Sequence, residues 1–340
     1  MLAAPGRGRR VSLVSEGHGR AGFDLDALRP AGGFGDYAKG VAWALTRRGL
    51  ELGGAYLWIG SRVPPESGLS SSAALTVALA FAFDRLFGLG QSARALALAA
   101  HRGESEFVGV GCGILDPFAS ALGGRDGLLR IDCRDQSVRR VDPGPREVAL
   151  LVSQSGVSRR LAEGGYRERV EQCRAAFRAA RQAGILGPGA TALRDLSVED
   201  LPALEGTLSE TLLRRARHVV TENRRVDQVV AALGAGDLAA VGERLREGQA
   251  SLRDDFEVSV PELDLLCEAA DAQPGTWGSR LTGAGFGGCT LHLVAPERAG
   301  AIADAVARAF AERFGWEPAI LRVRPGAGAG DLTLPGARPR

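Results

Sequence analysis

The segment PPESGLSSSAAL, residues 64–75, places one glycine and three successive serines between an alternating apolar stretch and a long apolar run. This pattern predicts a strand, a loop and a buried helix. The start of such a helix exposes unpaired backbone N–H groups and the positive end of the helix dipole, which together bind phosphate. It is not a Walker loop, because the lysine of that motif is absent. The structural alternative is an ordinary serine N-cap.

Acidic residues occur in a second segment, GESEFVGVGCGILDPFASALG, residues 103–123, which is otherwise apolar and rich in glycine. Partial burial strengthens what a carboxylate can do in acid–base or metal chemistry, so the three acids Glu104, Glu106 and Asp116 are candidates for such roles. Asp116 also begins a predicted helix, with Pro117 next to it. A helix N-cap is therefore its structural alternative.

A third segment, RLTGAGFGGCTLHLV at residues 280–294, has four glycines within six positions between two apolar strands. Glycines permit positive φ angles and let a ligand or another backbone approach closely. A plain hairpin would rarely need so many, so a ligand-binding loop is favoured over a structural turn. The four glycines are Gly283, Gly285, Gly287 and Gly288.

Strands and helices of mixed order surround these segments and indicate an α+β fold with no internal repeat. We expect domains at residues 1–150 and 151–325 and a disordered tail at 326–340, which is rich in glycine, alanine and proline. Strands are predicted at residues 11–14, 55–59, 127–132, 147–153, 278–282, 290–294 and 319–323. Helices are predicted at 37–45, after the serine run, at 93–106, from 116, at 166–183, through most of 198–272 and at 298–314.

The composition excludes several classes of protein. A chain of 340 residues with 45% hydrophobic residues can bury a large core, and a net charge of +2 gives no field that would collect nucleic acid. The five cysteines lie far apart without a C-x-x-C pair, which argues against disulfides or a zinc site. No apolar run is long enough to cross a membrane. We therefore expect a cytoplasmic protein without nucleic-acid or membrane partners, and a monomer.

These segments resemble the conserved motifs of the GHMP kinase superfamily, and in particular the galactokinases. V-P-x-x-x-G-L-S-S-S-A-A looks like the second GHMP motif, which wraps the nucleotide phosphates. G-E-S-E-F-V-G-V-G-C-G-I-L-D is similar to the galactokinase A-E-x-x-F-V-G-x-x-C-G-I-M-D. The glycine-rich segment resembles the third GHMP motif. The resemblance extends over about residues 35–325.

The resemblance implies a GHMP kinase fold, with an N-terminal domain of ribosomal S5-like topology, a C-terminal α+β domain and an active site between them. It implies transfer of the ATP γ-phosphate to the anomeric hydroxyl of galactose, with Asp116 as the catalytic, substrate-binding aspartate and Mg²⁺ held by Ser72 and Glu104. It assigns the ATP phosphates to Gly68, Leu69, Ser70, Ser71, Ser72, Ala73, Gly283, Gly285, Gly287 and Gly288.

Three further sequence motifs are typical of galactokinases: GYRERVEQC at residues 165–173, HVVTENRRV at 218–226, and SLRDDFEVSVPELDLL at 251–266. By this resemblance Tyr166 contacts the sugar. Without it, Tyr166 would be interpreted as a surface aromatic, and the charges of residues 253–255 as a solvated turn.

The chain departs from the family in three places. Glu66 and Pro117 stand where the family usually has glycine and glutamine, and Glu66 would repel phosphate if it faced the nucleotide. The first family motif, A-P-G-R-V-N-L-I-G-E-H-T-D-Y, which supplies an arginine and the sugar-binding Glu, His and Asp, is not matched. Arg7, Glu16 and His18 could suggest it, but RVSLVSEGH resembles a later strand. We therefore expect much weaker activity from this chain than from one extended upstream.

Two functional alternatives remain open. One is a catalytically impaired GHMP protein that binds sugar or nucleotide as a regulator, which would fit the unmatched first motif. The other is a kinase of a related sugar such as N-acetylgalactosamine, because the sugar pocket decides between similar hexoses.

Overall fold

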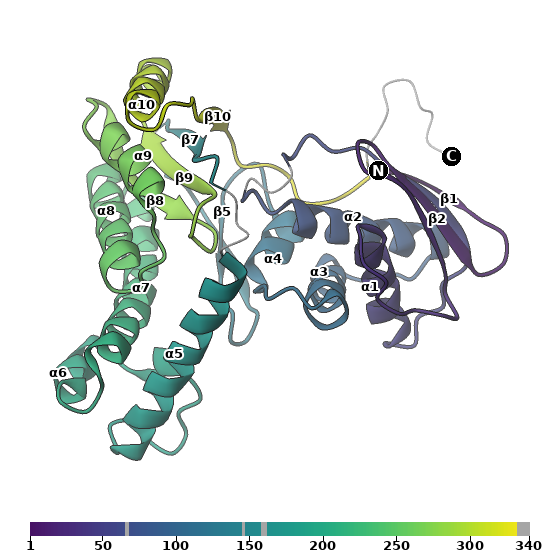
Figure 1. Ribbon diagram of the computed structural model, residues 1–340, viewed down its shortest axis with the longest axis horizontal. Coiled ribbons are helices and arrows are strands. Elements are labelled where there is room, and N and C mark those ends of the chain that lie inside the picture. The colour runs from purple at the N-terminus through teal and green to yellow at the C-terminus, as the bar shows by residue number, and fades with distance from the viewer. Residues whose placement is uncertain (65–67, 145–146, 158–161, 332–340) are drawn as a thin grey trace. The chain divides into compact units, whose positions relative to one another are not determined.

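The computed structural model describes residues 1–64, 68–144, 147–157 and 162–331, which form two compact units (Figure 1). The first unit contains Met1–Pro64, Ser70–Arg140 and Pro325–Arg340, and the second contains Pro65–Leu69 and Val141–Arg324. The domain boundary expected at residue 150 stays a prediction. In the structure the chain passes from the first unit to the main part of the second between Arg140 and Val141.

A four-stranded sheet in the order β1-β4-β2-β3 forms one layer of the first unit. Its strands are β1 (Leu2–Pro5), β2 (Arg10–Ser15), β3 (Gly19–Asp24) and β4 (Ala55–Ile59). β2 and β4 are parallel, and the other two pairs are antiparallel. Residues alternate between buried and exposed along β4, so the sheet has one core face.

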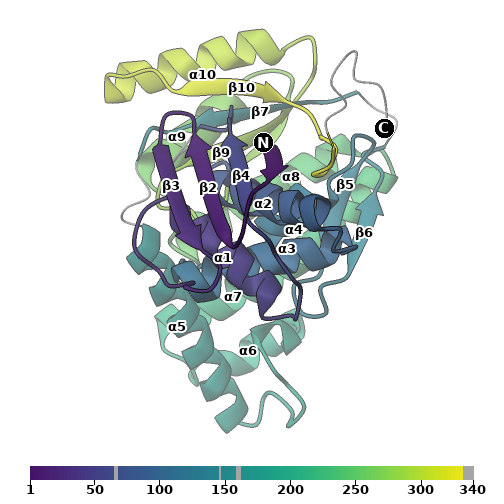
Figure 2. The same ribbon diagram turned by 90° about the vertical axis from the view of Figure 1, so that its right-hand side faces the viewer.

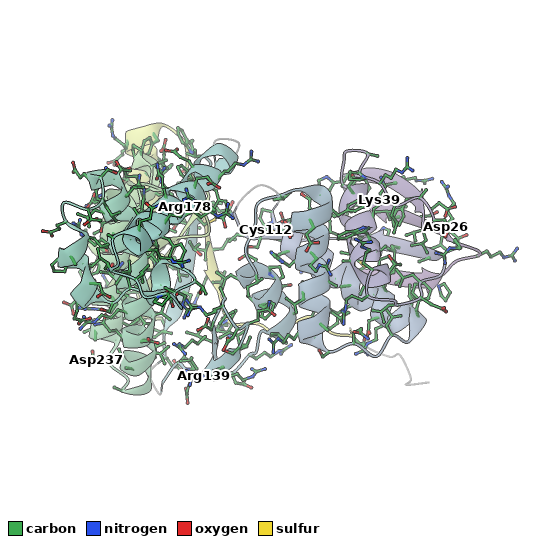
Figure 3. All side chains as sticks on the ribbon, turned by 90° about the horizontal axis from the view of Figure 1, so that it is seen from below. Asp26, Lys39, Cys112, Arg139, Arg178 and Asp237 are labelled. Carbon is green, nitrogen blue, oxygen red and sulfur yellow. The ribbon has the colours of Figure 1, made fainter. Side chains whose placement is uncertain are left out.

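Helices cover that core face (Figure 2). They are α1 (Gly35–Thr46), α2 (Ser71–Phe87), α3 (Ala93–Arg102) and α4 (Leu115–Leu122), and a two-stranded sheet of β5 (Leu128–Ile131) and β6 (Val138–Val141) follows them. Val11, Leu13, Val41 and Phe83 are buried in the core between the sheet and these helices. Figure 3 shows Lys39 projecting from α1, where its amino group lies 2.6 Å from the Asp36 carboxylate.

The helix predicted at residues 93–106 changes its winding at residue 103. A π-helical turn, η1 (Gly103–Val108), directly follows α3. A Cβ atom on Gly40 of α1 would lie 2.4 Å from the Gly103 carbonyl oxygen, so only glycine permits this contact between α1 and η1. The turn carries Glu104, and π-turns are frequent at functional sites.

Residues 325–331 pack against the C-terminal end of α4. The Gly328 amide donates to the Gly123 carbonyl at 2.9 Å, and the Ala329 amide donates to the Ser120 carbonyl at 2.9 Å. Asp331 lies 3.2 Å from Arg85. These residues belong to the tail that the sequence predicted to be disordered, so the ordered chain extends past residue 325. The remainder, 332–340, lies outside the described residues.

The second unit is built on an antiparallel sheet in the order β10-β7-β9-β8. Its strands are β7 (Ala149–Gln154), β8 (Thr276–Thr282), β9 (Cys289–Val294) and β10 (Ala319–Val323). Apolar residues of α9 and α10, including Leu266, Ile302 and Phe310, pack on this sheet. The helices are α5 (Ala162–Gln182), α6 (Leu201–Leu204), α7 (Glu210–Gly234), α8 (Leu238–Asp254), α9 (Pro261–Asp271) and α10 (Ala299–Phe314).

The predicted α+β class and every predicted strand are confirmed within a few residues. Three strands were not predicted. β1 consists of leucine, two alanines and a proline, of which alanine and proline are uncommon in strands, β3 contains two glycines, and β6 carries two arginines in four residues, so none has a clear strand pattern. Among the described residues, no helix is long and apolar enough to cross a membrane.

Candidate active site

The serine run begins helix α2 in a strained conformation. Ser70 occupies the N-cap position with φ 57° and ψ 41°, and Gly68 also has a positive φ of 84°. A non-glycine residue in the left-handed region costs on the order of 1 kcal/mol or more, and such strain is concentrated at functional sites. In the described part of the chain, the Ser70 side chain makes no capping hydrogen bond. The ordinary serine N-cap is therefore wrong for Ser70. Glu66 lies outside the described residues.

Ser72 and Glu104 lie together beside Asp116. Glu104 comes from the π-helical turn, is only 3% exposed, and forms a side-chain hydrogen bond with Ser72 of α2. Burial raises the pKa of the Glu104 carboxyl, the negative charge of Asp116 raises it further, and Ser72 and His101 lower it. The structure thus brings together the predicted metal ligands and the predicted catalytic aspartate, all within the first unit.

Asp116 lies inside the first turn of α4. The helix begins at Leu115 with Ile114 at the N-cap, so Asp116 is the second residue of the helix and Pro117 the third. The helix-cap interpretation of Asp116, with proline at the first position, is therefore wrong. A negative charge is nevertheless stabilised at this position by the helix dipole.

The loop between Glu104 and Asp116 is held by a histidine. The His101 Nε2 atom lies 3.1 Å from the Cys112 carbonyl oxygen. Burial raises the pKa of the Cys112 thiol to about 12, with further contributions from Glu104 and Asp116. The thiol is therefore protonated at neutral pH and unreactive as a nucleophile.

A divalent cation fits these side chains. Mg²⁺ usually binds through one or two carboxylates together with substrate phosphates, rather than through a complete protein cage. Ser72 offers a hydroxyl oxygen, and Glu104 and Asp116 offer two carboxylates whose mutual repulsion a cation would relieve. The described residues include no cluster of three His, Cys, Asp or Glu side chains that could hold a metal alone.

The third glycine loop, residues 283–288 of the second unit, has a positive φ at almost every position. Gly283, Gly285, Gly287 and Gly288 all have positive φ, and so does Phe286 at 58°. The loop is also closely packed, since a Cβ atom on Gly285 would lie 2.3 Å from the Val258 carbonyl oxygen and one on Gly287 would lie 2.7 Å from that of Val157. Glycine is therefore required here by geometry, and the hairpin interpretation alone does not account for it.

Tyr166 lines a cavity next to this loop. The cavity has a volume of about 360 Å³ and is bounded by α5, by residues 252–258 and by the third glycine loop. Its wall is mainly apolar, with two arginines of α5. Tyr166 therefore lies at the edge of a pocket of the second unit and is 36% exposed.

Arg7, Glu16 and His18 lie in exposed turns of the first unit. Arg7 follows β1, whereas Glu16 and His18 lie in the tight turn between β2 and β3. RVSLVS forms strand β2, as the sequence predicted, and an exposed hairpin turn does not form a sugar pocket.

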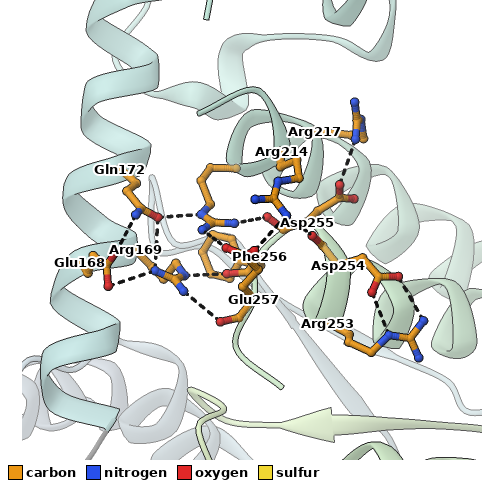
Figure 4. Close-up of polar contacts among 11 residues, drawn as sticks. Glu168, Arg169, Gln172, Arg214, Arg217, Arg253, Asp254, Asp255, Phe256 and Glu257 are labelled. Atoms are coloured by element: carbon orange, nitrogen blue, oxygen red, sulfur yellow. Dashed lines mark hydrogen bonds and ion pairs between the residues drawn. The ribbon is translucent and has the colours of Figure 1, made fainter. Parts of the chain in front are cut away.

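The sequence did not single out a cluster of buried arginines in the second unit. Arg169 and Arg215 are at most 9% exposed and contact the segment 255–257 (Figure 4). The only feature of the sequence that could have indicated this cluster is that its residues lie in or near the three galactokinase-like motifs.

Comparisons with known proteins agree with these motifs. Residues 36–124 match the model of the GHMP kinases N terminal domain, and residues 229–312 match that of the GHMP kinases C terminal domain. The chain is 43% identical to a galactokinase of Roseiflexus sp. (strain RS-1), over 96% of this chain and 83% of that protein. It is 45% identical to a galactokinase of Chloroflexus aurantiacus, over 86% of this chain and 74% of the relative.

Solved structures give the same picture. The crystal structure of Lactococcus lactis galactokinase complexed with galactose superposes with a TM-score of 0.92 at 35% identity, covering 97% of this chain and 86% of that one. A mevalonate kinase structure superposes with a TM-score of 0.62 at 16% identity, covering 96% of this chain and 89% of that one, which shows a shared fold.

Proposed function

Because this chain belongs to the galactokinases of the GHMP kinase superfamily, we propose that it transfers the γ-phosphate of ATP to the anomeric hydroxyl of galactose, giving galactose 1-phosphate. The observation that carries the proposal is the meeting of Ser72, Glu104 and Asp116 at the start of two helices in the first unit. A kinase needs an acid beside the acceptor hydroxyl and donors around the phosphates, and these residues supply both kinds of group.

Asp116 has the role of the catalytic base. Its carboxylate accepts or orients the proton of the sugar 1-hydroxyl as the new O–P bond forms and the bond from the γ-phosphorus to ADP breaks. The proton then passes from Asp116 to solvent. The phosphate oxygens accept hydrogen bonds from amides at the start of α2, the end at which the serine run and the strained Ser70 lie.

Ser72 and Glu104 hold the divalent cation. A kinase of this family uses ATP together with a divalent metal, and we propose Mg²⁺ because the side chains offer only oxygen ligands. When bound, the ion neutralises phosphate charge. The raised pKa of Glu104 fits this role, because a cation would favour the ionised form that burial disfavours.

The four glycines of the third loop are proposed to contact the phosphates, and Tyr166 the sugar. Support comes from the strained, closely packed conformation of the loop and from the cavity that Tyr166 shares with it. A cytoplasmic location and a monomeric state remain our predictions.

The test is a coupled assay of ADP release with purified protein, Mg²⁺-ATP and a panel of galactose, N-acetylgalactosamine, glucose and mannose. We expect galactose to give the largest kcat/KM and EDTA to abolish turnover. The released product should be identified as the 1-phosphate by NMR. A larger kcat/KM for N-acetylgalactosamine would show that this sugar, and not galactose, is the preferred substrate. Binding of galactose or ATP without turnover would support the alternative of a catalytically impaired regulator.

A further inference from the structure

One polar cluster of the second unit joins three segments that are far apart in the chain. Arg169 lies on α5 within the first galactokinase-like motif, Arg215 lies on α7 three residues before the second motif, and residues 255–257 belong to the third motif, after α8. Figure 4 shows Arg169 and Arg214 beside this short segment.

Arg215 is the more deeply buried of the two arginines, at 1% exposure. Its Nη1 donates to the Asp255 carbonyl, its Nη2 donates to the Glu257 carboxylate, and its Nε donates to the Gln172 side chain at 2.7 Å. Arg214 donates to the other Glu257 carboxylate oxygen at 2.9 Å. Both oxygens of Glu257 are therefore used by arginines, which holds its pKa below the usual range.

Arg169 binds the same segment from α5. Its Nε donates to the Phe256 carbonyl at 2.6 Å, and its Nη2 donates to the Glu257 carbonyl at 3.0 Å. Together with the Arg215 bond, three successive backbone carbonyls accept hydrogen bonds from two guanidinium groups. This fixes the backbone of residues 255–257 in an uncommon conformation, with Glu257 at a positive φ of 54°.

The fixed segment contacts the third glycine loop directly. The Phe286 amide donates to the Val258 carbonyl at 2.7 Å, and the same oxygen lies where a side chain at Gly285 would begin. The loop also contacts α5. A Cβ atom on Gly165 would lie 2.4 Å from the Phe286 ring, and the Arg169 guanidinium lies 5.7 Å from the centre of that ring.

We infer that Arg169, Arg215 and Glu257 are positioning residues that fix the third glycine loop relative to Tyr166. They act through Val258 and Phe286. The inference rests on the proposed function, in which the loop contacts ATP and Tyr166 contacts the sugar. In this arrangement one ion-pair cluster, with Arg215 buried at its centre, sets the geometry of both substrate contacts in the second unit.

The test compares two acid-to-amide substitutions in the same motif, residues 251–266. In Glu257→Gln, the amide can accept a hydrogen bond at one atom only, so one arginine loses its partner. In the control, Asp254→Asn, the side chain is 60% exposed and pairs with Arg253 in solvent. We expect Glu257→Gln to raise KM for both ATP and galactose by about 10-fold, as expected for loss of one charged hydrogen bond. The control should stay within about 2-fold.

A second readout follows the loop itself. Hydrogen exchange of the Phe286 amide, which is bonded to Val258, should become about 10-fold faster in Glu257→Gln and stay unchanged in Asp254→Asn. A purely structural role would lower the melting temperature and the fraction of active enzyme, but it would leave both KM values and the local exchange rate as in the unchanged protein. That result would overturn the inference.

Further variants keep the test decisive if Glu257→Gln does not fold. Arg169→Lys retains the charge but cannot span two carbonyls, and Arg215→Lys retains one donor of three, so both should give smaller changes in the same direction. An unchanged protein that phosphorylates none of the tested sugars would refute the proposed function. The exchange measurement would still test the positioning role, because it requires no turnover.

Discussion

Two glutamates, one in each unit, have opposite electrostatic surroundings. Glu104 of the first unit is buried beside another carboxylate, Asp116, and its pKa is raised. Glu222 of the second unit is partly buried, with its side chain 22% exposed, but Arg280 and Arg225 outweigh the effect of burial and lower its pKa. Arginines thus neutralise Glu222 within the folded chain, whereas in the proposed function a cation and substrate neutralise the acidic charge around Glu104. On that proposal, the difference separates a structural cluster from a catalytic one.

The largest expected effect, which tests whether the acidic cluster of the first unit is catalytic, is that of a substitution at Asp116. Asp116→Asn keeps the size of the side chain but cannot accept the sugar proton, so kcat should fall by about 10²- to 10⁴-fold. ATP affinity, measured by titration calorimetry, should stay within about 2-fold, since the amides at the start of α2 are unchanged. Turnover near that of the unchanged protein would remove Asp116 from the mechanism.

The next effect concerns two buried histidines of the second unit. Burial lowers the pKa of His218 and of His292 to about 4. Because the unfolded chain binds these protons at pH values near 6.5 and the folded chain does not, stability should be complete above pH 6.5 and fall as the pH approaches 4. The expected loss between pH 7 and pH 5 is about 2 kcal/mol for each histidine.

This loss can be measured from urea unfolding at the two pH values. His218→Asn retains a polar group near Ser251, which the imidazole contacts at 3.0 Å, and should reduce the pH dependence. His18→Asn, in an exposed turn, is the control and should not. An equal pH dependence in both variants would show that the loss arises elsewhere.

The two glutamates themselves should respond in opposite directions. The raised pKa of Glu104 means that its ionised form costs stability above that pKa, so Glu104→Gln at pH 7 without Mg²⁺ should leave stability unchanged or increase it. Glu222→Gln leaves Arg225 or Arg280 without a charged partner and should cost about 2 kcal/mol. Urea midpoints give both values, and equal losses would contradict the comparison. Glu104→Gln should still lose kinase activity.

The smallest effect is expected where an ion pair is exposed. Arg9 and Asp26 of the first unit pair at 2.5 Å with side chains 48% and 66% exposed. Asp26→Asn should change stability by less than about 0.5 kcal/mol, because water screens the pair. A loss of unfolding free energy as large as that of Glu222→Gln would mean that burial does not explain why the charged pairs of the two units differ in strength.

Local sequence determined most strands and helices and indicated the segments that we propose bind phosphate. Alternation over residues 55–59 and the apolar run after the serines follow from periods of 2 and 3.6 residues, which depend only on neighbours in the chain. The glycines of residues 283–288 could be recognised because their backbone angles are almost closed to other residues. Family resemblance then assigned Asp116, Ser72 and Glu104, which the fold brings together.

Tertiary structure alone decided the rest. The π-helical turn at Gly103 depends on Gly40 of another helix, and the order of residues 326–331 depends on carbonyls at the end of α4. The charges at residues 253–257 look alike in sequence, yet Asp254 faces solvent and Glu257 contacts two arginines, of which Arg215 is buried. A sequence specifies which charges exist, but their partners come from distant segments, and burial by those segments sets whether each charge stabilises the fold or remains available for chemistry.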